Sequence, residues 1–307
     1  MTDIYLHVGA HKTGSTYLQH CLYNSPAFFA AQDCTLVTHP DFPDGTPPPE
    51  VIDDIVQWRR NPLDVPAPES LARFLDHLKG LPTKSALWTY EGFLGEMNLS
   101  VTPALYGRAP GIVRSLGELL DGTPTKIAFT VRSFPDYIES SYKWVIRNNR
   151  SIRFERYLDS IDLDRLTWRP AVEALRNTFG DDNVLVTSYE AYRADSPAGN
   201  HQILRHFFGS DVDLSQFNNL DNVEHNRSPN AKALEFARLV HAALRRAEVM
   251  TLEDRRYVNK RLVGFINDTF TAELDPEPPL LMDADLKREL HARYVKECQE
   301  LGISLTG

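Results

Sequence analysis

Short apolar runs alternate along the chain with segments whose apolar residues follow helical spacing. The apolar runs are residues 4–8, 85–90, 126–131 and 183–187. Their length and their polar or glycine ends predict buried strands. Between them, apolar residues at spacings of three, four and seven, as at positions 138, 142 and 145, predict helices. Strands that alternate with helices predict an α/β protein, with a central parallel sheet and helices on both faces.

Two segments depart from this alternation. Residues 25–83 contain eight of the 20 prolines between Pro40 and Pro68, on either side of a short predicted helix at 51–60. We interpret this segment as an insertion over the mouth of the sheet, since apolar residues persist through it. From residue 230 onward the pattern is helical, with one apolar stripe at Leu234, Ala237, His241 and Leu244. Neither segment resembles a linker, so we expect a single domain over residues 1–307, with 230–307 as its helical C-terminal part.

Composition narrows the class of protein. The 307 residues carry a formal net charge of -9, which argues against a protein that wraps nucleic acid. The three cysteines are far apart, and no signal peptide or apolar run of 18 residues is visible. We therefore expect a cytoplasmic protein that has neither disulfides nor a membrane span.

The segment Gly9-Ala-His-Lys-Thr-Gly-Ser-Thr16 carries the strongest chemical signal. A strand, a glycine-bounded loop and a helix N-terminus together make an anion site, from backbone N–H groups and the helix dipole. A nucleotide kinase of the P-loop class places lysine directly after the second glycine. Here Ser15 has that place and Lys12 lies inside the loop. At the apex of the loop, Lys12 would lie beside the bridging oxygen of a 5′-phosphate-linked donor shorter than a triphosphate.

A second motif lies at Arg132 and Ser140, eight residues apart. The segment Ser133-Phe-Pro-Asp136 predicts a capping box, so a helix begins directly after Arg132. Ser140 then falls in the second turn of that helix, and a guanidinium and a hydroxyl can converge on one phosphate.

The run His7-Val-Gly-Ala-His-Lys-Thr-Gly-Ser-Thr-Tyr-Leu-Gln19 resembles the donor-binding loop of sulfotransferases, particularly their bacterial branch. These enzymes use 3′-phosphoadenosine 5′-phosphosulfate (PAPS), release adenosine 3′,5′-bisphosphate (PAP), and have a P-loop-like three-layer α/β fold. The resemblance implies that Lys12 contacts the transferred sulfuryl group and its bridging oxygen. It further implies a 5′-phosphate site at Thr13, Gly14, Ser15 and Thr16, and a 3′-phosphate site at Arg132 and Ser140.

Two shorter segments resemble the same family. In Val186-Thr-Ser-Tyr-Glu190, Tyr189 would lie near the adenine, and a purely structural tyrosine is the alternative. In Asn226-Arg-Ser228, Arg227 would be a second ligand of the 3′-phosphate, and a surface arginine is the alternative.

The acceptor needs a base, and the sequence offers two candidates. Glu91 ends the strand at 85–90, where it would face Lys12, and related carbohydrate sulfotransferases use a glutamate in a comparable place. A structural glutamate that pairs with Lys12 or caps a helix is the alternative. His11, next to Lys12, is a rival. His7 lies within the first strand, and we expect it to be a core histidine.

Aromatic residues beside cations suggest where an acceptor could bind. They are Trp58, Arg59 and Arg60 in the insertion, and Lys143, Trp144, Arg147 and Arg150 in the predicted helix after Arg132. Such groups suit sugars and anions, but a solvated helix face explains the charges equally well.

The expected reaction is transfer of a sulfuryl group to a hydroxyl or amine of a carbohydrate or small metabolite. We expect no metal requirement, because a sulfuryl group carries less charge than a phosphoryl group. Two alternatives remain open, namely a P-loop kinase that uses Mg·ATP and a non-catalytic protein that binds adenosine nucleotides.

Overall fold

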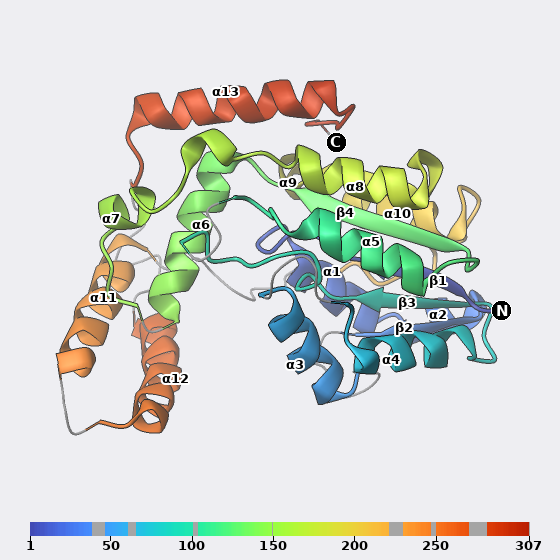
Figure 1. The fold of residues 1–307 in the computed structure, drawn as a ribbon, viewed down its shortest axis with the longest axis horizontal. Coiled ribbons are helices and arrows are strands. Elements are labelled where there is room, and N and C mark those ends of the chain that lie inside the picture. Colours follow the sequence, from blue (N-terminus) through green and yellow to red (C-terminus); the bar gives the residue numbers. More distant parts are fainter. Residues whose placement is uncertain are drawn as a thin grey trace.

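A computed structural model describes residues 1–38, 47–60, 66–100, 104–148, 150–220, 230–246, 250–269 and 281–306. Within these residues, five parallel strands form one sheet in the order β2-β3-β1-β4-β5 (Figure 1). They are β1 (Asp3–His7), β2 (Cys34–Val37), β3 (Ser85–Thr89), β4 (Thr125–Val131) and β5 (Val184–Ser188). The four predicted strands are confirmed, with ends shifted by one residue at most, and so is the parallel α/β class.

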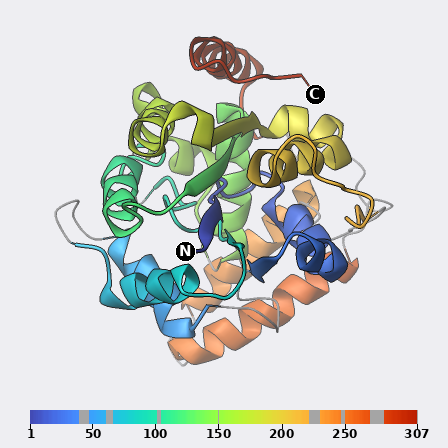
Figure 2. The ribbon, with the colours of Figure 1, turned by 90° about the vertical axis from the view of Figure 1, so that its right-hand side faces the viewer.

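Helices cover both faces of the sheet, because alternate strand residues point to opposite sides. Ile4 and Leu6 of β1 lie in one apolar cluster, while Tyr5 lies in the other. The first cluster includes side chains of α3 (Pro49–Trp58), α4 (Glu69–Lys79), α5 (Ala109–Leu119) and α8 (Arg169–Phe179). The second includes side chains of α1 (Ser15–Tyr23), α2 (Pro26–Ala31) and α10 (Ser196–Phe208). Figure 2 shows these two groups of helices on opposite sides of the sheet, which confirms the three-layer arrangement.

Strand β2 was not predicted. It lies inside the segment 25–83, which we interpreted as an insertion over the mouth of the sheet, and it forms the edge beside β3. The strand is four residues long, and its two middle residues, Thr35 and Leu36, are only partly buried. Because such a strand needs few apolar side chains, the sequence shows no continuous apolar run here. The insertion interpretation is therefore wrong for β2, whereas the short helix expected at 51–60 is confirmed as α3.

Helix α6 (Phe134–Arg147) links the sheet to the helical C-terminal part. Both α11 (Ala231–Arg246) and α13 (Ala284–Glu300) contact α6, and α12 (Leu252–Thr269) contacts α11. Figure 1 shows α11 and α12 as an arm beside α6, and α13 across the top of the molecule. The remaining helices are α7 (Phe154–Leu158), α9 (Tyr189–Ala194) and two 3₁₀ turns, Leu163–Arg165 and Asp181–Asn183. In the parts of the chain placed by the structure, no helix combines the length and the apolar character that a bilayer crossing requires.

The start of α6 is tied to α13 and α9. Ser133 is the N-cap, as predicted, but no capping box forms. Its hydroxyl is hydrogen-bonded to His291 Nδ1 at 3.2 Å, and its backbone N–H donates to Glu190 Oε1 at 3.0 Å instead of to Asp136. Glu190 Oε2 also accepts from the Tyr294 hydroxyl at 2.7 Å. Helix α13 thereby fixes the ends of β4 and β5, where the site described next is located.

Candidate functional site

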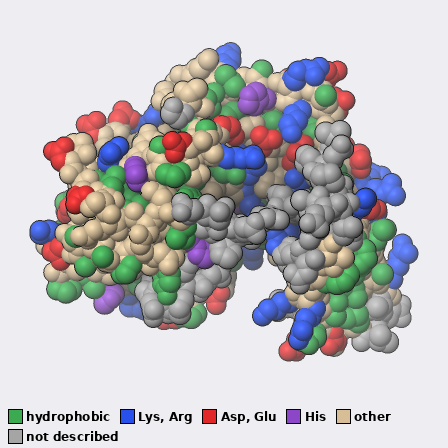
Figure 3. All heavy atoms as spheres, turned by 180° about the vertical axis from the view of Figure 1, so that it is seen from behind, with side chains coloured by type: hydrophobic (Ala, Val, Ile, Leu, Met, Phe, Trp, Pro, Cys, Tyr) green, Lys and Arg blue, Asp and Glu red, His purple; other side chains and the backbone are tan. Residues whose placement is uncertain are grey.

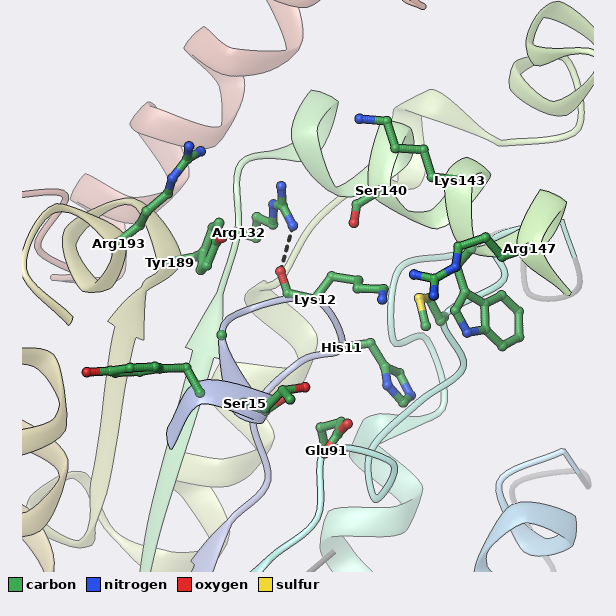
Figure 4. A pocket seen from close by; sticks show the side chains of 15 residues that line it. His11, Lys12, Ser15, Glu91, Arg132, Ser140, Lys143, Arg147, Tyr189 and Arg193 are labelled. Carbon is green, nitrogen blue, oxygen red and sulfur yellow. Dashed lines mark hydrogen bonds between the residues drawn. The ribbon is translucent and has the colours of Figure 1, made fainter. Parts of the chain in front are cut away.

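The carboxyl ends of the central strands meet at one edge of the sheet, and the segments after them enclose a cavity of about 470 Å³. In Figure 3, Lys and Arg side chains gather around the hollowed middle of one face. The cavity itself is seen from close by in Figure 4. Its lining residues are His11, Lys12, Gly14, Ser15, Thr16, Tyr17, Glu91, Met97, Arg132, Ser140, Lys143, Trp144, Arg147, Tyr189 and Arg193.

The loop between β1 and α1 adopts an unusual backbone. Lys12 and Gly14 both lie in the left-handed region, with φ of 64° and 86°. The glycine is required for a second reason, since a Cβ at position 14 would lie 2.7 Å from Tyr192 Cε1. A left-handed conformation costs a non-glycine residue about 1–2 kcal/mol, so the surrounding structure holds Lys12 in this conformation against strain. The predicted strand, loop and helix N-terminus are therefore all present.

The Lys12 ammonium is held in surroundings that disfavour a positive charge. The pKa of Lys12 is lowered to about 8, mainly by burial and also by the Arg147 and Arg132 guanidinium groups, against the opposing effect of the Glu91 carboxylate. A bound anion would reverse this imbalance, because an opposite charge nearby favours the protonated amine.

Arg132 lies at the end of β4 and contacts the loop directly. Its Nη1 donates to the Lys12 carbonyl at 2.6 Å, and its guanidinium lies 4.5 Å from the ring centroid of Tyr189. Its buried Nε has no hydrogen-bond partner among the described residues. Ser140 lines the same cavity from α6, so the predicted Arg132–Ser140 pair and the Lys12 loop belong to one site.

The two candidate bases, Glu91 and His11, line the cavity near Lys12 (Figure 4). Glu91 Oε2 accepts a hydrogen bond from Gln19 Nε2 at 2.9 Å. Burial lowers the pKa of His11 to about 4, against the opposing effect of Glu91, so its imidazole is neutral at neutral pH. Its buried Nε2 has no partner within the described ranges, and its backbone N–H donates to the Tyr106 hydroxyl at 2.8 Å. The His11 Nε2 is therefore neutral, buried and without a partner among the described residues, whereas the Glu91 carboxylate already accepts a hydrogen bond from the Gln19 amide.

His7 is a core residue, as expected. It is 2 % exposed, its Nδ1 is 2.9 Å from the Thr89 hydroxyl, and burial lowers its pKa to about 4. It does not line the cavity.

Other predicted residues lie elsewhere. The Thr13 side chain is buried, donates to the Ala10 carbonyl and does not line the cavity, so only its backbone can serve a ligand there. Arg227 lies outside the described residues. Trp58 and Arg59 are buried, and Glu96 pairs with both Arg59 and Arg60 at 3.0 and 2.8 Å. Trp58 and Arg59 therefore form neither an acceptor surface nor a solvated helix face. The two arginines instead bind Glu96, in the segment that follows β3.

The group on α6 is different. Lys143, Trp144 and Arg147 line the cavity, so the solvated-face interpretation is wrong for them, whereas Arg150 is exposed. Their spacing of three, four and seven from Ser140 places them on its helix face, and this signal was available in the sequence. Arg193 was missed, although it follows Tyr189 by one helical turn. Met97 and Tyr17 also line the cavity, and no sequence signal pointed to them.

The charge of the cavity is opposite to that of the chain. Five lining side chains are Lys or Arg, and Glu91 is the single carboxylate among the described lining residues. The whole chain carries a net charge of -9. A cluster of cations that lines one cavity within an acidic protein favours a multiply charged anion.

Three solved structures illustrate what the chain resembles. A sulfotransferase from Alicyclobacillus acidocaldarius is 15% identical, with a TM-score of 0.41 over 83% of this chain and 99% of that one. Mouse sulfotransferase SULT7A1 complexed with PAP is 17% identical, with a TM-score of 0.39 over 96% and 88%. Retinol dehydratase in complex with androsterone and PAP is 15% identical, with a TM-score of 0.38 over 97% and 81%. No family model and no curated protein matches the chain. The resemblance is one of overall fold.

Proposed function

We propose that the protein transfers a sulfuryl group from PAPS to an acceptor hydroxyl or amine and releases PAP. One observation carries this proposal: the Lys12 loop and the Arg132–Ser140 pair line a single cavity. A ligand with phosphates on both the 3′ and the 5′ side of an adenosine would engage both groups. ATP has phosphates on the 5′ side alone, and would leave Arg132 and Ser140 without a role.

The residues of the cavity suit the two ends of such a donor. Backbone N–H groups at the start of α1, with the Ser15 and Thr16 side chains, would hold the 5′-phosphate at the positive end of the helix dipole. The Arg132 guanidinium, together with the Ser140 hydroxyl, would hold the 3′-phosphate. Tyr189, whose ring lies against the Arg132 guanidinium, would lie near the adenine.

In the proposed reaction the acceptor oxygen or nitrogen attacks sulfur in line. A bond from the acceptor atom to sulfur forms as the bond from sulfur to the 5′-phosphate oxygen breaks, and PAP leaves. The Lys12 ammonium would donate to that bridging oxygen as its negative charge develops. His11 Nε2 would take the proton of the acceptor, and the Glu91 carboxylate beside it would stabilise the imidazolium that forms. Each of these roles is assigned to a side chain of this protein, and none of them needs a metal ion. That the reaction needs no metal remains a prediction.

We expect PAP, and not Mg·ATP, to stabilise the folded protein. At a concentration 100-fold above its Kd, a ligand adds about 2.7 kcal/mol to the free energy of unfolding, which raises Tm by several degrees. The measurement is a thermal-shift titration with PAP in the presence of a chelator, with Mg·ATP, and with 5′-AMP, which lacks only the 3′-phosphate of PAP. Stabilisation by Mg·ATP alone would identify a kinase and contradict the proposal. Strong binding of PAP, with no transfer from PAPS to any acceptor, would identify a non-catalytic nucleotide-binding protein.

We expect Arg132→Met to weaken PAP binding by roughly 10- to 100-fold, the worth of a charge-assisted hydrogen-bond pair. Binding of 5′-AMP should change much less, because the lost contact is with the 3′-phosphate. Isothermal titration of both nucleotides measures the difference, and Arg156→Met, at an exposed arginine of α7, is the matched control. An equal loss for PAP and 5′-AMP would remove Arg132 from the 3′-phosphate site and leave it a structural role beside Lys12.

A further inference from the structure

One face of α6 extends beyond Ser140 with groups that the donor does not account for. Ser140, Lys143, Trp144 and Arg147 all line the cavity, at the spacing of one helical stripe. A helix rises about 1.5 Å per residue, so the stripe runs roughly 10 Å from Ser140 to Arg147. Two cations and an indole therefore follow the proposed 3′-phosphate ligand along the wall of the cavity.

Arg147 is a half-buried cation with no neutralising partner among the described residues. Burial lowers the pKa of Arg147, and no carboxylate in the described parts of the chain forms an ion pair with its guanidinium. Arg59 and Arg60 differ in this respect, because both form an ion pair with Glu96. The guanidinium is also not needed to hold the end of α6. The Arg147 backbone carbonyl there already accepts a hydrogen bond from Asn259 Nδ2 at 3.0 Å. Partly desolvated charges are retained where a partner offsets the cost, so Arg147 is expected to meet an anion from outside the chain.

The position of Arg147 indicates which anion this is. In Figure 4, Arg193 and Tyr189 lie at one end of the cavity, beyond Arg132, while Arg147 and His11 lie at the other. The Lys12 ammonium points toward the Arg147 end. Lys12 would sit at the bridging oxygen, and an in-line acceptor must approach sulfur from the side opposite the leaving 5′-phosphate. The positive charge of Arg147 is therefore placed with the acceptor and with the candidate base, His11.

We propose that the acceptor is itself an anion: an alcohol or amine that carries a carboxylate or a similar acidic group, held by Arg147 and Lys143. This inference rests on the proposed function and names the substrate class of the same site. The planar guanidinium of Arg147 suits bidentate pairing with a carboxylate. Trp144, on the same stripe, offers a flat apolar surface for the sugar or aromatic ring that carries the two groups.

The test compares acids with their amides, which differ in charge but hardly in shape. Glucuronate and glucuronamide form one pair, and 4-hydroxyphenylacetate and its amide form the other. Each compound is titrated calorimetrically into the PAP-saturated protein, so the readout is binding and does not depend on turnover. The variants are Arg147→Gln, Arg147→Lys and Lys143→Gln. Arg150→Gln, at an exposed arginine three residues after Arg147, is the matched control.

We expect at least one acid to bind roughly 10-fold or more tightly than its amide. Arg147→Gln should abolish this preference while PAP affinity stays within about two-fold, and Arg147→Lys should retain part of it. Lys143→Gln should reduce the preference, and Arg150→Gln should preserve it. The inference is overturned if neither acid binds more tightly than its amide, including the case in which none of the four binds. It is also overturned if Arg147→Gln weakens PAP as much as the acid, because Arg147 would then serve the donor. Failure of PAP itself to bind would be a different result, since it would overturn the proposed function first and this inference with it.

Discussion

Replacing Lys12 with methionine is expected to lower kcat for transfer from PAPS by roughly 10²- to 10³-fold, the usual cost of losing one donor at a developing charge. Methionine is an unbranched side chain only one atom shorter than lysine, and it carries no charge. Because the bridging oxygen gains its negative charge only as the bond to sulfur breaks, PAP affinity should fall much less than kcat. Turnover is measured as PAP release, with an acceptor found by screening sugars, lipids and small alcohols against labelled PAPS. Lys296→Met, at an exposed lysine of α13, should leave the rate unchanged.

The pH dependence of PAP binding tests the same assignment. Burial lowers the pKa of Lys12 to about 8 in the free protein, so the ammonium is lost as the pH rises through that value. The Lys12 ammonium favours binding of an anionic ligand. PAP affinity should therefore be highest below about pH 8 and decline above it. Lys12→Met should bind PAP with no such decline. A decline that persists in Lys12→Met would assign it to another group, and an unchanged kcat would exclude Lys12 from the chemical step.

The parts of the fold that were predicted share a strong local signal. Strands β1, β3 and β4 are apolar runs buried from end to end or nearly so, and the loop after β1 has Gly14 where the left-handed backbone favours glycine. Strand β2 gave no such signal, because an edge strand with two partly exposed residues needs few apolar side chains. Its place in the sheet follows from pairing with β3, a long-range contact that periodicity does not report.

The residues of the candidate site also divide into those with a local sequence signal and those without one. Lys12 lies in the loop after β1, Arg132 lies at the end of β4, and Ser140 lies in α6, which begins directly afterwards, so the parallel topology brought them together as expected. The roles of Arg59 and Arg147 depended on which face of a helix is buried and on what lies opposite it. Arg59 is buried against Glu96, a partner 37 residues away, and the sequence alone gave no reason to pair them. Arg147 belongs to the stripe of Ser140, which helical spacing does reveal once Ser140 is taken as a ligand.

The largest remaining effect is expected at the base. Replacing His11 with asparagine should lower kcat by roughly 10²-fold or more, the lower bound for loss of a general base, while PAP affinity stays nearly unchanged. The physical reason is that His11 Nε2 is buried, neutral and without a partner among the described residues. The Glu91 carboxylate is already hydrogen-bonded to Gln19. Glu91→Gln should therefore cost less, about 10-fold, because it removes only the stabilisation of the imidazolium.

The pH profile separates these two residues. Burial lowers the pKa of His11 to about 4, so the base is lost only as the pH falls through that value, and kcat/KM should decline toward about pH 4. His11→Asn should remove this acid limb, whereas Glu91→Gln should shift it to lower pH, since the carboxylate raises the histidine pKa. His77→Asn, at an exposed histidine of α4, is the matched control and should change neither kcat nor the profile. A nearly normal rate in His11→Asn, together with a loss of 10²-fold or more in Glu91→Gln, would instead make Glu91 the base, because the proton of the acceptor would then pass to the carboxylate.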